Sequence, residues 1–320
     1  MKRPKLSIND VAPRDGLQNE RAFVPTADKI SLIDAMSRTG LAKIEATSFV
    51  SPKAIPALCD AAEVMRGITR VGGVVYTALI PNVRGAERAL ECGVDEFNLV
   101  MSASETHNLV NLRMTREQSC AALKEVMALA RGAGVPVNVS LSCVFGCPME
   151  GDVAPSEVMR LAAGFVSLGA TGITLCDTTG MAYPTQVADL CADFLSRFPA
   201  TELTLHVHDT RGLALANVMS AAKVGVRRFD ASLGGLGGCP YAPGASGNAC
   251  TEDVVHMLDL IGYDTGVDLD ALVTCAKRLP GLIGHDLPSQ LVKAGPRLKR
   301  HPVPAMFEEI RARALAREAA

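Results

Sequence analysis

The feature that most constrains this chain is a repeated alternation of short, β-rich apolar runs with longer helix-like segments. Eight such runs occupy residues 6–12, 43–50, 73–80, 96–103, 135–144, 171–178, 202–210 and 227–235. Strand–helix alternation indicates an α/β protein with a parallel sheet, and eight strands each followed by helical material match a (β/α)8 barrel. We therefore predict a (β/α)8 TIM barrel with extra C-terminal helices.

The segments between the runs carry the signals of helices. Residues 26–40, 115–134 and 156–170 are amphipathic, and "TREQ" at 115–118 matches a capping box. Glycines that suit helix C-caps precede the runs at Gly40, Gly93, Gly134, Gly169 and Gly225.

An open, doubly wound sheet is the competing α/β architecture. It would suit five or six strands and a Gly-rich nucleotide loop after the first strand, whereas the first run here leads into "PRDGLQNE". With no linker or low-complexity segment, we predict one domain over residues 1–320. The barrel would occupy about 5–265, and one or two helices with a charged tail about 266–320.

Composition restricts the class of protein. A chain of 320 residues that is 48% hydrophobic, with a formal charge of −2, no Trp and 4% aromatic residues, favours a globular protein without a nucleic-acid partner. No apolar run reaches the ~18 residues of a membrane span, and the basic start "MKRPKLSIND" lacks the apolar segment of a secretory signal. We expect a cytoplasmic protein with no membrane partner, and a solvated basic run at 293–301.

The ten cysteines include no CxxC pair, and a cytosolic protein keeps its thiols reduced. Most are expected to pack as small apolar residues. Cys143 and Cys147 could form half of a metal site, although no matching pair stands elsewhere.

Two of the six histidines stand two residues apart in "LTLHVHDTRG", residues 203–212. Side chains two apart on a strand face the same way, and the C-terminal ends of barrel strands carry the catalytic groups. Charged and metal-binding side chains gather at these strand ends: Arg14, Asp15, Glu45, Asp177, His206, His208, Asp209, Cys239 and Asn248.

The histidine pair predicts a metal site. Strands 1, 7 and 8 are neighbours in a closed barrel, so Asp15 and Asn248 can complete a set with His206 and His208. Two nitrogen and two oxygen ligands suit an octahedral divalent cation, Mg²⁺ or Mn²⁺, with Zn²⁺ as an alternative. Asp209 would orient a ligand or cap the next helix.

The loop "GGLGGCPYAPGASGN" holds six glycines in fifteen residues. One interpretation is a loop that closes over a substrate and delivers the thiol of Cys239. A second is a Gly-rich connection with an incidental cysteine. A third is a phosphate site, because "GASGNACTED" opens a helix whose N-terminus favours anions.

Several motifs together resemble those of 3-hydroxy-3-methylglutaryl-CoA lyase, a barrel metallolyase, over roughly residues 5–280. They are "VAPRDGLQNE", "IEATSFVSP", "SCVFGCPMEG", "HVHDTRGLALAN" and "GLGGCPYAPGASGNACTEDVVHML". The resemblance implies an acyl-CoA substrate that is cleaved to acetyl-CoA and acetoacetate, the chemistry of leucine degradation and ketone-body formation. It is also compatible with a homodimer or a higher homo-oligomer.

The resemblance also assigns residues. It implies that Asp15, His206, His208 and Asn248 hold the divalent cation, and that Arg14, Glu45, Asp177 and Cys239 are catalytic. We further assign Gln18 and Ser48, which lie in the same motifs, to substrate binding.

The cleavage needs a proton removed, an enolate stabilised and a carbanion protonated. Arg14 suits the enolate oxygen, and the Cys239 thiol suits the final protonation. The base that deprotonates the hydroxyl stays open between Asp15, Glu45 and a metal-bound water. Glu45 would otherwise only orient Arg14 through an ion pair.

Three departures from the family pattern leave open which acyl group the protein accepts and how it contacts coenzyme A. "CDTTG" replaces the usual "GDTIG", "SASETHNLVNL" differs from the animal enzymes, and Arg21 replaces a lysine. Lyases for citramalyl-CoA or for longer branched 3-hydroxyglutaryl-CoAs therefore stay open. A condensing synthase of the same superfamily and a non-catalytic protein with a structural metal are the remaining alternatives.

Overall fold

The computed structural model describes residues 3–238 and 247–318, and its centre is a closed barrel of eight strands in the order β1 to β8. All neighbouring strands, including β1 and β8, are parallel. The strands are β1 (Ser7–Asp10), β2 (Lys43–Ser48), β3 (Val75–Leu79), β4 (Glu96–Ser102), β5 (Val137–Ser142), β6 (Gly172–Asp177), β7 (Glu202–Val207) and β8 (Arg228–Ala231). Each lies inside a predicted run, so the barrel prediction is confirmed.

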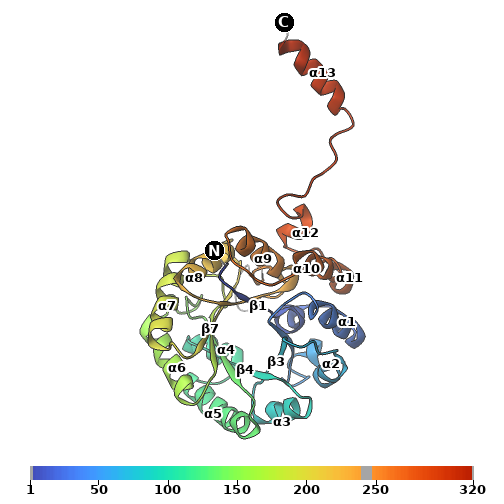
Figure 1. Ribbon diagram of the computed structural model, residues 1–320. Coiled ribbons are helices and arrows are strands. Elements are labelled where there is room, and N and C mark those ends of the chain that lie inside the picture. The colour runs from blue at the N-terminus through green and yellow to red at the C-terminus, as the bar shows by residue number, and fades with distance from the viewer. Residues whose placement is uncertain (1–2, 239–246, 319–320) are drawn as a thin grey trace.

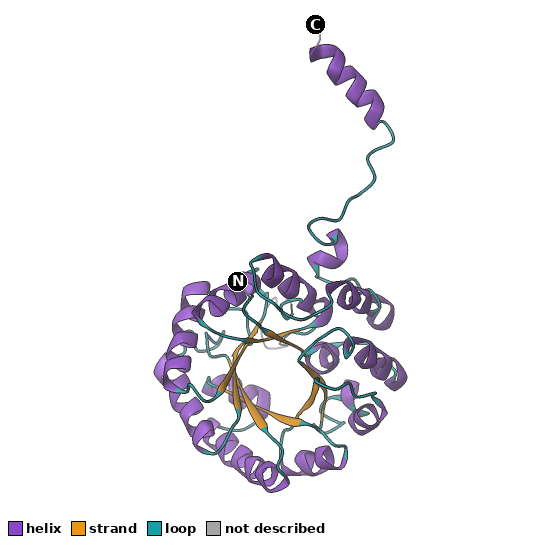
Figure 2. Cartoon of the chain, in the orientation of Figure 1, coloured by secondary structure: helices purple, strands orange, loops and turns teal. Residues whose placement is uncertain are grey.

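Helices form a ring outside the strands (Figure 2). They are α1 (Thr26–Met36), α2 (Ala61–Gly67), α3 (Val83–Glu91), α4 (Glu105–Leu112), α5 (Arg116–Ala133), α6 (Pro155–Ser167), α7 (Pro184–Arg197), α8 (Ala214–Val224) and α9 (Thr251–Leu260). The capping box of Thr115 and Gln118 is present at the start of α5, which ends at Gly134 with φ of 71°. None of the described helices is long and apolar enough to cross a membrane.

The C-terminal region departs from the prediction of one or two helices followed by a charged tail. In the described part of the chain, which ends at residue 318, four helices follow α9: α10 (Leu269–Ala276), α11 (Leu279–Ile283), α12 (Gln290–Ala294) and α13 (Phe307–Glu318). Breaks such as Gly284, with φ of 80°, divide the segment into short pieces. The predicted tail is α13, which projects away from the barrel and has no buried residue (Figure 1).

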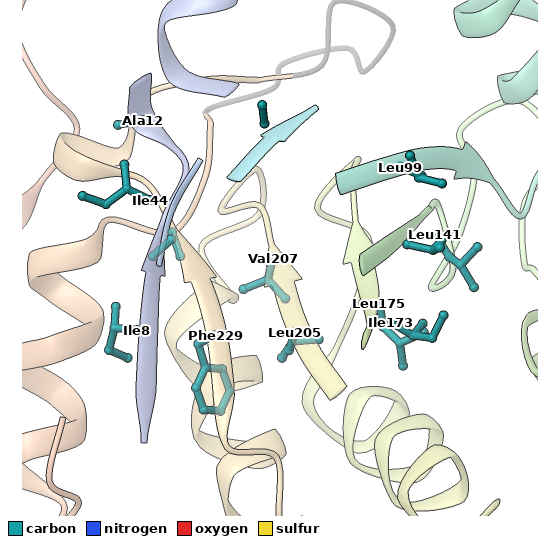
Figure 3. Packing of buried hydrophobic residues seen from close by; sticks show 14 of the residues in the cluster. Ile8, Ala12, Ile44, Leu99, Leu141, Ile173, Leu175, Leu205, Val207 and Phe229 are labelled. Atoms are coloured by element: carbon teal, nitrogen blue, oxygen red, sulfur yellow. The ribbon is translucent and has the colours of Figure 1, made fainter. Parts of the chain in front are cut away.

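The apolar core lies between the strands and the helices. Alternate strand residues such as Ile8, Leu205 and Phe229 are completely buried and belong to one hydrophobic cluster (Figure 3). This packing uses only one face of each strand, because successive side chains point to opposite faces.

The other face of each strand gives the barrel a polar interior. A small cavity of about 20 Å³ is lined by residues from all eight strands. One such residue from each strand is Asn9, Lys43, Thr77, Asn98, Asn138, Thr174, Thr204 and Asp230. Barrel interiors of this type are usually filled by bulky branched apolar residues, so the polar lining is unusual.

Candidate active site

The loop after β1 is a single π-helical turn, Ala12–Gly16, and it carries Arg14 and Asp15. The N–H groups of Asp15 and Gly16 both donate to the carbonyl oxygen of Val11, at 2.7 and 3.3 Å. Arg14 and Asp15 are both only 8% exposed. Single π turns often occur at functional sites, and this one places a cation and an anion at the C-terminal mouth of the barrel.

His206 and His208 project from the end of β7 with their rings together. Their Nε2 atoms are 3.2 Å apart, and both side chains are buried. Two nitrogens that bind an octahedral ion at right angles, each at about 2.1 Å, would lie about 3 Å apart. One ligand atom from each of Asp15, His206 and His208 can be chosen so that all three lie within 4.8 Å of one another. The pair therefore has the spacing of adjacent metal ligands.

Asn248 reaches the same point from a segment that follows β8. A backbone bridge pairs Asn248 with His208, and the Ala249 N–H donates to the Val207 carbonyl oxygen at 3.0 Å. The Asn248 amide nitrogen donates to Asp15 Oδ2 at 2.7 Å and to the Leu236 carbonyl oxygen at 2.9 Å.

The surroundings of the Asn248 amide oxygen show whether these residues fit a bound cation. Among the described residues, this buried Oδ1 atom has no hydrogen-bond donor, and the same is true of Nδ1 of His208. A buried acceptor without a donor costs about 1–3 kcal/mol. A cation beside Asp15 and the imidazole pair would satisfy the Asn248 oxygen, so the residues fit a divalent ion.

Asp230, on β8, was missed by the sequence analysis. Its Oδ2 lies 3.4 Å from His206 Nδ1, and its Oδ1 accepts a 2.8 Å hydrogen bond from Asn9. A carboxylate behind a histidine fixes the tautomer, so Asp230 favours a proton on Nδ1 and a free lone pair on Nε2. The available signal was an acidic residue inside a strand run, "RRFDASLGG".

The site is strongly polarised. Burial alone would raise the pKa of Asp15, but Arg14 and the two histidines lower it to about 2. Burial, followed by the neighbouring His206, lowers the pKa of His208 to about 4. Burial also opposes protonation of His206, yet Asp230 raises its pKa above the ordinary value. Asp15 and His208 are thereby held in the unprotonated forms that ligate cations.

Arg14 lies between two carboxylates. Its Nε donates to Glu45 Oε2 at 2.5 Å, and its Nη1 donates to Asp15 Oδ1 at 2.6 Å. Although burial opposes the charge, Glu45 and Asp15 raise the pKa of Arg14 above its ordinary value. None of the described residues accepts a hydrogen bond from Nη2 of Arg14. The N–H groups of this nitrogen are therefore available to a substrate beside the candidate metal ligands.

Gln18 and Ser48, assigned to substrate binding, differ in their surroundings. Gln18 donates to Asp15 Oδ1 at 3.0 Å, so it lies against a candidate metal ligand. The Ser48 hydroxyl, at the end of β2, instead accepts from the Val50 N–H at 3.3 Å and donates to the Leu79 carbonyl oxygen at 3.5 Å. Substrate binding by either residue stays a prediction.

Two aspartates at strand ends are occupied by backbone groups. Asp177 accepts from the N–H groups of Met181 and Ala182 at 2.8 and 3.2 Å, and burial raises its pKa to about 6. Asp209 accepts from the N–H of Ala214, the first residue of α8, at 2.9 Å, although the N-cap position of that helix is Leu213. Asp177 therefore shapes the loop after β6, and a direct catalytic role for it stays a prediction.

Cys239, the predicted acid, lies outside the described residues. The phosphate interpretation of this loop receives no support from α9, because its first turn carries Glu252 and Asp253 and Glu252 is completely buried. Cys143 and Cys147 are buried, and the metal-competent group found in the described chain does not include them.

The family model described as HMGL-like matches residues 5–278. The chain belongs to the HMGL-like family. The predicted resemblance is thereby confirmed over nearly the whole barrel.

Two lyases are similar to this chain over almost their full length. The hydroxymethylglutaryl-CoA lyase YngG of Bacillus subtilis is 50% identical over 286 residues, which are 89% of this chain and 96% of that protein. An (R)-citramalyl-CoA lyase of Chloroflexus aurantiacus is 40% identical over 301 residues, covering 91% of this chain and 95% of the relative.

A solved structure supports the same family and fold. The HMG-CoA lyase of Acinetobacter baumannii, in complex with coenzyme A and 3-methylmalate, is 53% identical with a TM-score of 0.90. The match covers 94% of this chain and 98% of that one. The carboxyl transferase domain of Rhizobium etli pyruvate carboxylase, 17% identical with a TM-score of 0.68, shares the fold alone.

Proposed function

We propose that this protein is a carbon–carbon lyase that cleaves 3-hydroxy-3-methylglutaryl-CoA to acetyl-CoA and acetoacetate with the help of a divalent cation. The observation that carries the proposal is the Arg14 guanidinium, held by Glu45 and Asp15 directly beside the candidate ligand set. The names of the similar lyases and the coenzyme A bound to one of them support it.

The reaction breaks the bond between C2 and C3 of the substrate as the C3 hydroxyl becomes a ketone. A divalent cation bound by Asp15, His206, His208 and Asn248 would supply Lewis acidity toward the substrate hydroxyl. The electron pair of the broken bond enters the thioester as an enolate, whose oxygen Arg14 would stabilise. A preorganised donor of this kind typically contributes ~10²–10³ in rate.

The geometry narrows the choice of base. Glu45 Oε1 accepts a hydrogen bond from Asn98 at 2.7 Å and Oε2 accepts from Arg14, so both of its oxygens have donors. This supports the orienting role of Glu45 over a direct one. Both oxygens of Asp15 also have donors, Arg14 on Oδ1 and Asn248 on Oδ2, so a water in the site becomes the first candidate for removing the hydroxyl proton.

Cys239 is proposed as the acid that protonates the acetyl carbon. Cys239→Ser should retain the fold and metal affinity but lose most turnover, because a serine hydroxyl is a far weaker acid than a thiol. Substrate should also protect Cys239 from alkylation, measured by peptide mapping. Wild-type turnover in the serine variant would assign the protonation to another group.

Citramalyl-CoA is the second candidate substrate, favoured by the 40% identity to a citramalyl-CoA lyase. A panel of 3-hydroxyacyl-CoAs, including longer branched 3-hydroxyglutaryl-CoAs, tests both. The highest kcat/KM on 3-hydroxy-3-methylglutaryl-CoA is expected, and a preference for citramalyl-CoA would reassign the substrate while retaining the reaction type.

Chelation tests the metal requirement. Activity should vanish with a chelator and return with Mg²⁺ or Mn²⁺, with Zn²⁺ as the third ion compared. Full activity in a protein shown to be metal-free would contradict the metal requirement and indicate a metal-independent mechanism. Net formation of the acyl-CoA from acetyl-CoA and a keto acid would instead indicate a condensing synthase, and a tightly held ion without turnover would indicate a structural metal.

The cellular setting belongs to the same proposal. We expect a cytoplasmic enzyme of leucine degradation and ketone-body chemistry that acts on an acyl-CoA, with a homodimer or higher homo-oligomer as its assembly. The similar proteins include both a cytoplasmic form in Danio rerio and mitochondrial forms, such as that of Gallus gallus. Fractionation and light scattering test these expectations.

A further inference from the structure

The polar interior of the barrel extends from the candidate active site toward its N-terminal mouth. At the active-site end stands Glu45, and at the opposite end Lys43 and Glu96 form a buried ion pair. Burying polar groups inside a barrel lowers the stability of the fold unless they are hydrogen-bonded, and a fully hydrogen-bonded network holds its side chains in one arrangement. The contacts of Asn98 show which active-site side chain this network holds.

Asn98 is the residue that connects the interior to the site. It lies on β4 and is 8% exposed. Its Oδ1 accepts from Asn138 Nδ2 at 2.9 Å and from the Ser140 hydroxyl at 2.8 Å. Asn138 also donates to the Thr174 hydroxyl at 2.9 Å, so its own amide is directed by a further strand.

These two donors determine which way the Asn98 amide points. With Oδ1 directed at Asn138 and Ser140, Nδ2 faces Glu45 and donates to Oε1 at 2.7 Å. The reverse orientation would place the Asn98 oxygen against the Glu45 carboxylate and its nitrogen against that of Asn138. Only one amide orientation satisfies the network.

The consequence for Glu45 is a fixed carboxylate. Oε1 accepts from Asn98 and Oε2 accepts from Arg14 Nε, and the side chain is 2% exposed. A carboxylate with only one donor could rotate about its last torsion, whereas two donors on different oxygens set the plane. Burial raises the pKa of Glu45, and the contacts with Arg14 and Asn98 oppose this rise.

We propose that Asn98 is a positioning residue that aligns Arg14 for the reaction through Glu45. Its own alignment comes from Asn138 and Ser140 in the barrel interior. The proposal rests on the function proposed above. Within the described structure Asn98 makes no hydrogen bond to Arg14 or to a candidate metal ligand, so its effect passes through the Glu45 carboxylate.

Asn98→Leu tests the proposal, because leucine keeps the approximate size and removes both hydrogen-bonding groups. Loss of a hydrogen bond to a buried charged group predicts a kcat lower by about tenfold to a hundredfold. The KM for the acyl-CoA and the affinity for Mn²⁺ should change less than about threefold, since the substitution removes no hydrogen bond to Arg14 or to a candidate metal ligand. A smaller loss is expected for Ser140→Ala, which removes one of the two donors to Asn98.

Thr77→Val is the matched control. Thr77 lines the same cavity, but its hydroxyl donates to the backbone carbonyl oxygen of Glu96 at 2.8 Å and it has no hydrogen bond to Glu45. Wild-type kcat is expected for this variant. An equal loss in Thr77→Val and Asn98→Leu would assign the effect to general damage of the interior and overturn the proposal.

A double-mutant cycle tests whether Asn98 acts through Glu45. In a Glu45→Ala background, Asn98→Leu should cause little further loss of kcat, because the intermediary is already absent. Independent, multiplicative losses would overturn the proposal. If Asn98→Leu does not fold, Asn98→Asp keeps the size, turns an acceptor toward Glu45 and should lower kcat at least as much.

A crystal structure of Asn98→Leu separates this inference from the proposed function. If the wild type cleaves none of the acyl-CoAs in the panel, the proposed function is wrong. The crystal structure of Asn98→Leu would still show whether Asn98 aligns Arg14. The expected result is an Arg14 Nε that has left Glu45 Oε2 and a re-oriented carboxylate. An unchanged Arg14–Glu45 pair would overturn the proposal.

Discussion

Arg14 uses two different nitrogens for its two ion pairs, Nε for Glu45 and Nη1 for Asp15. A guanidinium can do this because its donors are arranged in a rigid plane, whereas a lysine ammonium is a point charge on a flexible stem. At the scale of single residues, the site therefore depends on shape as well as charge.

Arg14→Lys should lower kcat by about a hundredfold or more while the KM for the acyl-CoA changes little. The charge is kept, but the alignment beside the metal ligands is lost. Steady-state kinetics on the metal-saturated enzyme provide the measurement. Near-normal turnover with much weaker substrate binding would make Arg14 a ground-state anchor.

Asp230 is the second residue whose role follows from one contact. Asp230→Asn should weaken binding of Mn²⁺ by about ten- to a hundredfold, because the carboxylate behind His206 no longer favours the required tautomer. Equilibrium dialysis or Mn²⁺ paramagnetic resonance measures this without turnover. Asp259→Asn, on α9, removes an aspartate bonded to Thr265 and serves as the control. Equal affinity in both variants would remove Asp230 from the site.

At the scale of elements, the segment that returns after β8 supplies Asn248, one of the four candidate metal ligands. Residues 247–251 run back between the ends of β7 and β8, and the Asp209 N–H donates to the Gly247 carbonyl oxygen at 2.9 Å. On the outgoing side, Gly237 has φ of 99°, and a Cβ there would lie 2.6 Å from Asn248 Nδ2 and 3.0 Å from the Asp15 carbonyl oxygen. Glycine is required by both the conformation and the space.

Gly237→Ala should therefore lower Mn²⁺ affinity by at least about tenfold, because the new methyl group displaces Asn248 from Asp15. Gly262→Ala is a matched control, since its φ of 98° imposes the same backbone penalty with nothing within 4 Å. Titration calorimetry with Mn²⁺ compares the two. The prediction is wrong if the two variants bind Mn²⁺ equally well.

At the scale of the whole molecule, buried carboxyl groups couple stability to pH. Burial raises the pKa of Glu252 from 4.5 to about 7, although bonds from Ser289 and Gly234 oppose the rise. Its folded-state pKa is above its unfolded value, so its contribution is most favourable below pH 4.5 and is lost as pH rises through 7. The full shift corresponds to about 3 kcal/mol.

Glu252→Gln isolates this contribution from the other titrating groups. The unfolding free energy of the wild type relative to the variant should fall by about 2 kcal/mol between pH 5 and pH 8. Urea unfolding at the two pH values measures the difference. A difference that does not vary with pH would contradict the raised pKa.

The sequence alone determined the barrel and the identity of its candidate metal ligands. Eight apolar runs with helical segments between them permit few architectures, and any closed parallel barrel brings its strand ends to one mouth. His206, His208, Asp15 and Asn248 could therefore be grouped without coordinates. The division of the described residues 266–318 into four helices was not anticipated, because proline and glycine breaks determine where such short helices end.

The tertiary structure decided which side chains orient the candidate catalytic residues and the candidate metal ligands. Asp230 meets His206 because the register of β7 and β8 places the two residues opposite each other. Asn98 meets Glu45 across the intervening strand β3, on which Thr77 lies opposite Glu45 and Leu79 lies opposite Asn98. A period-two pattern shows which residues share a face of a strand, but it does not show which residue of the next strand lies opposite. That register is set by the closure of the whole barrel, and so the contacts that orient Arg14 and His206 exist only in the folded molecule.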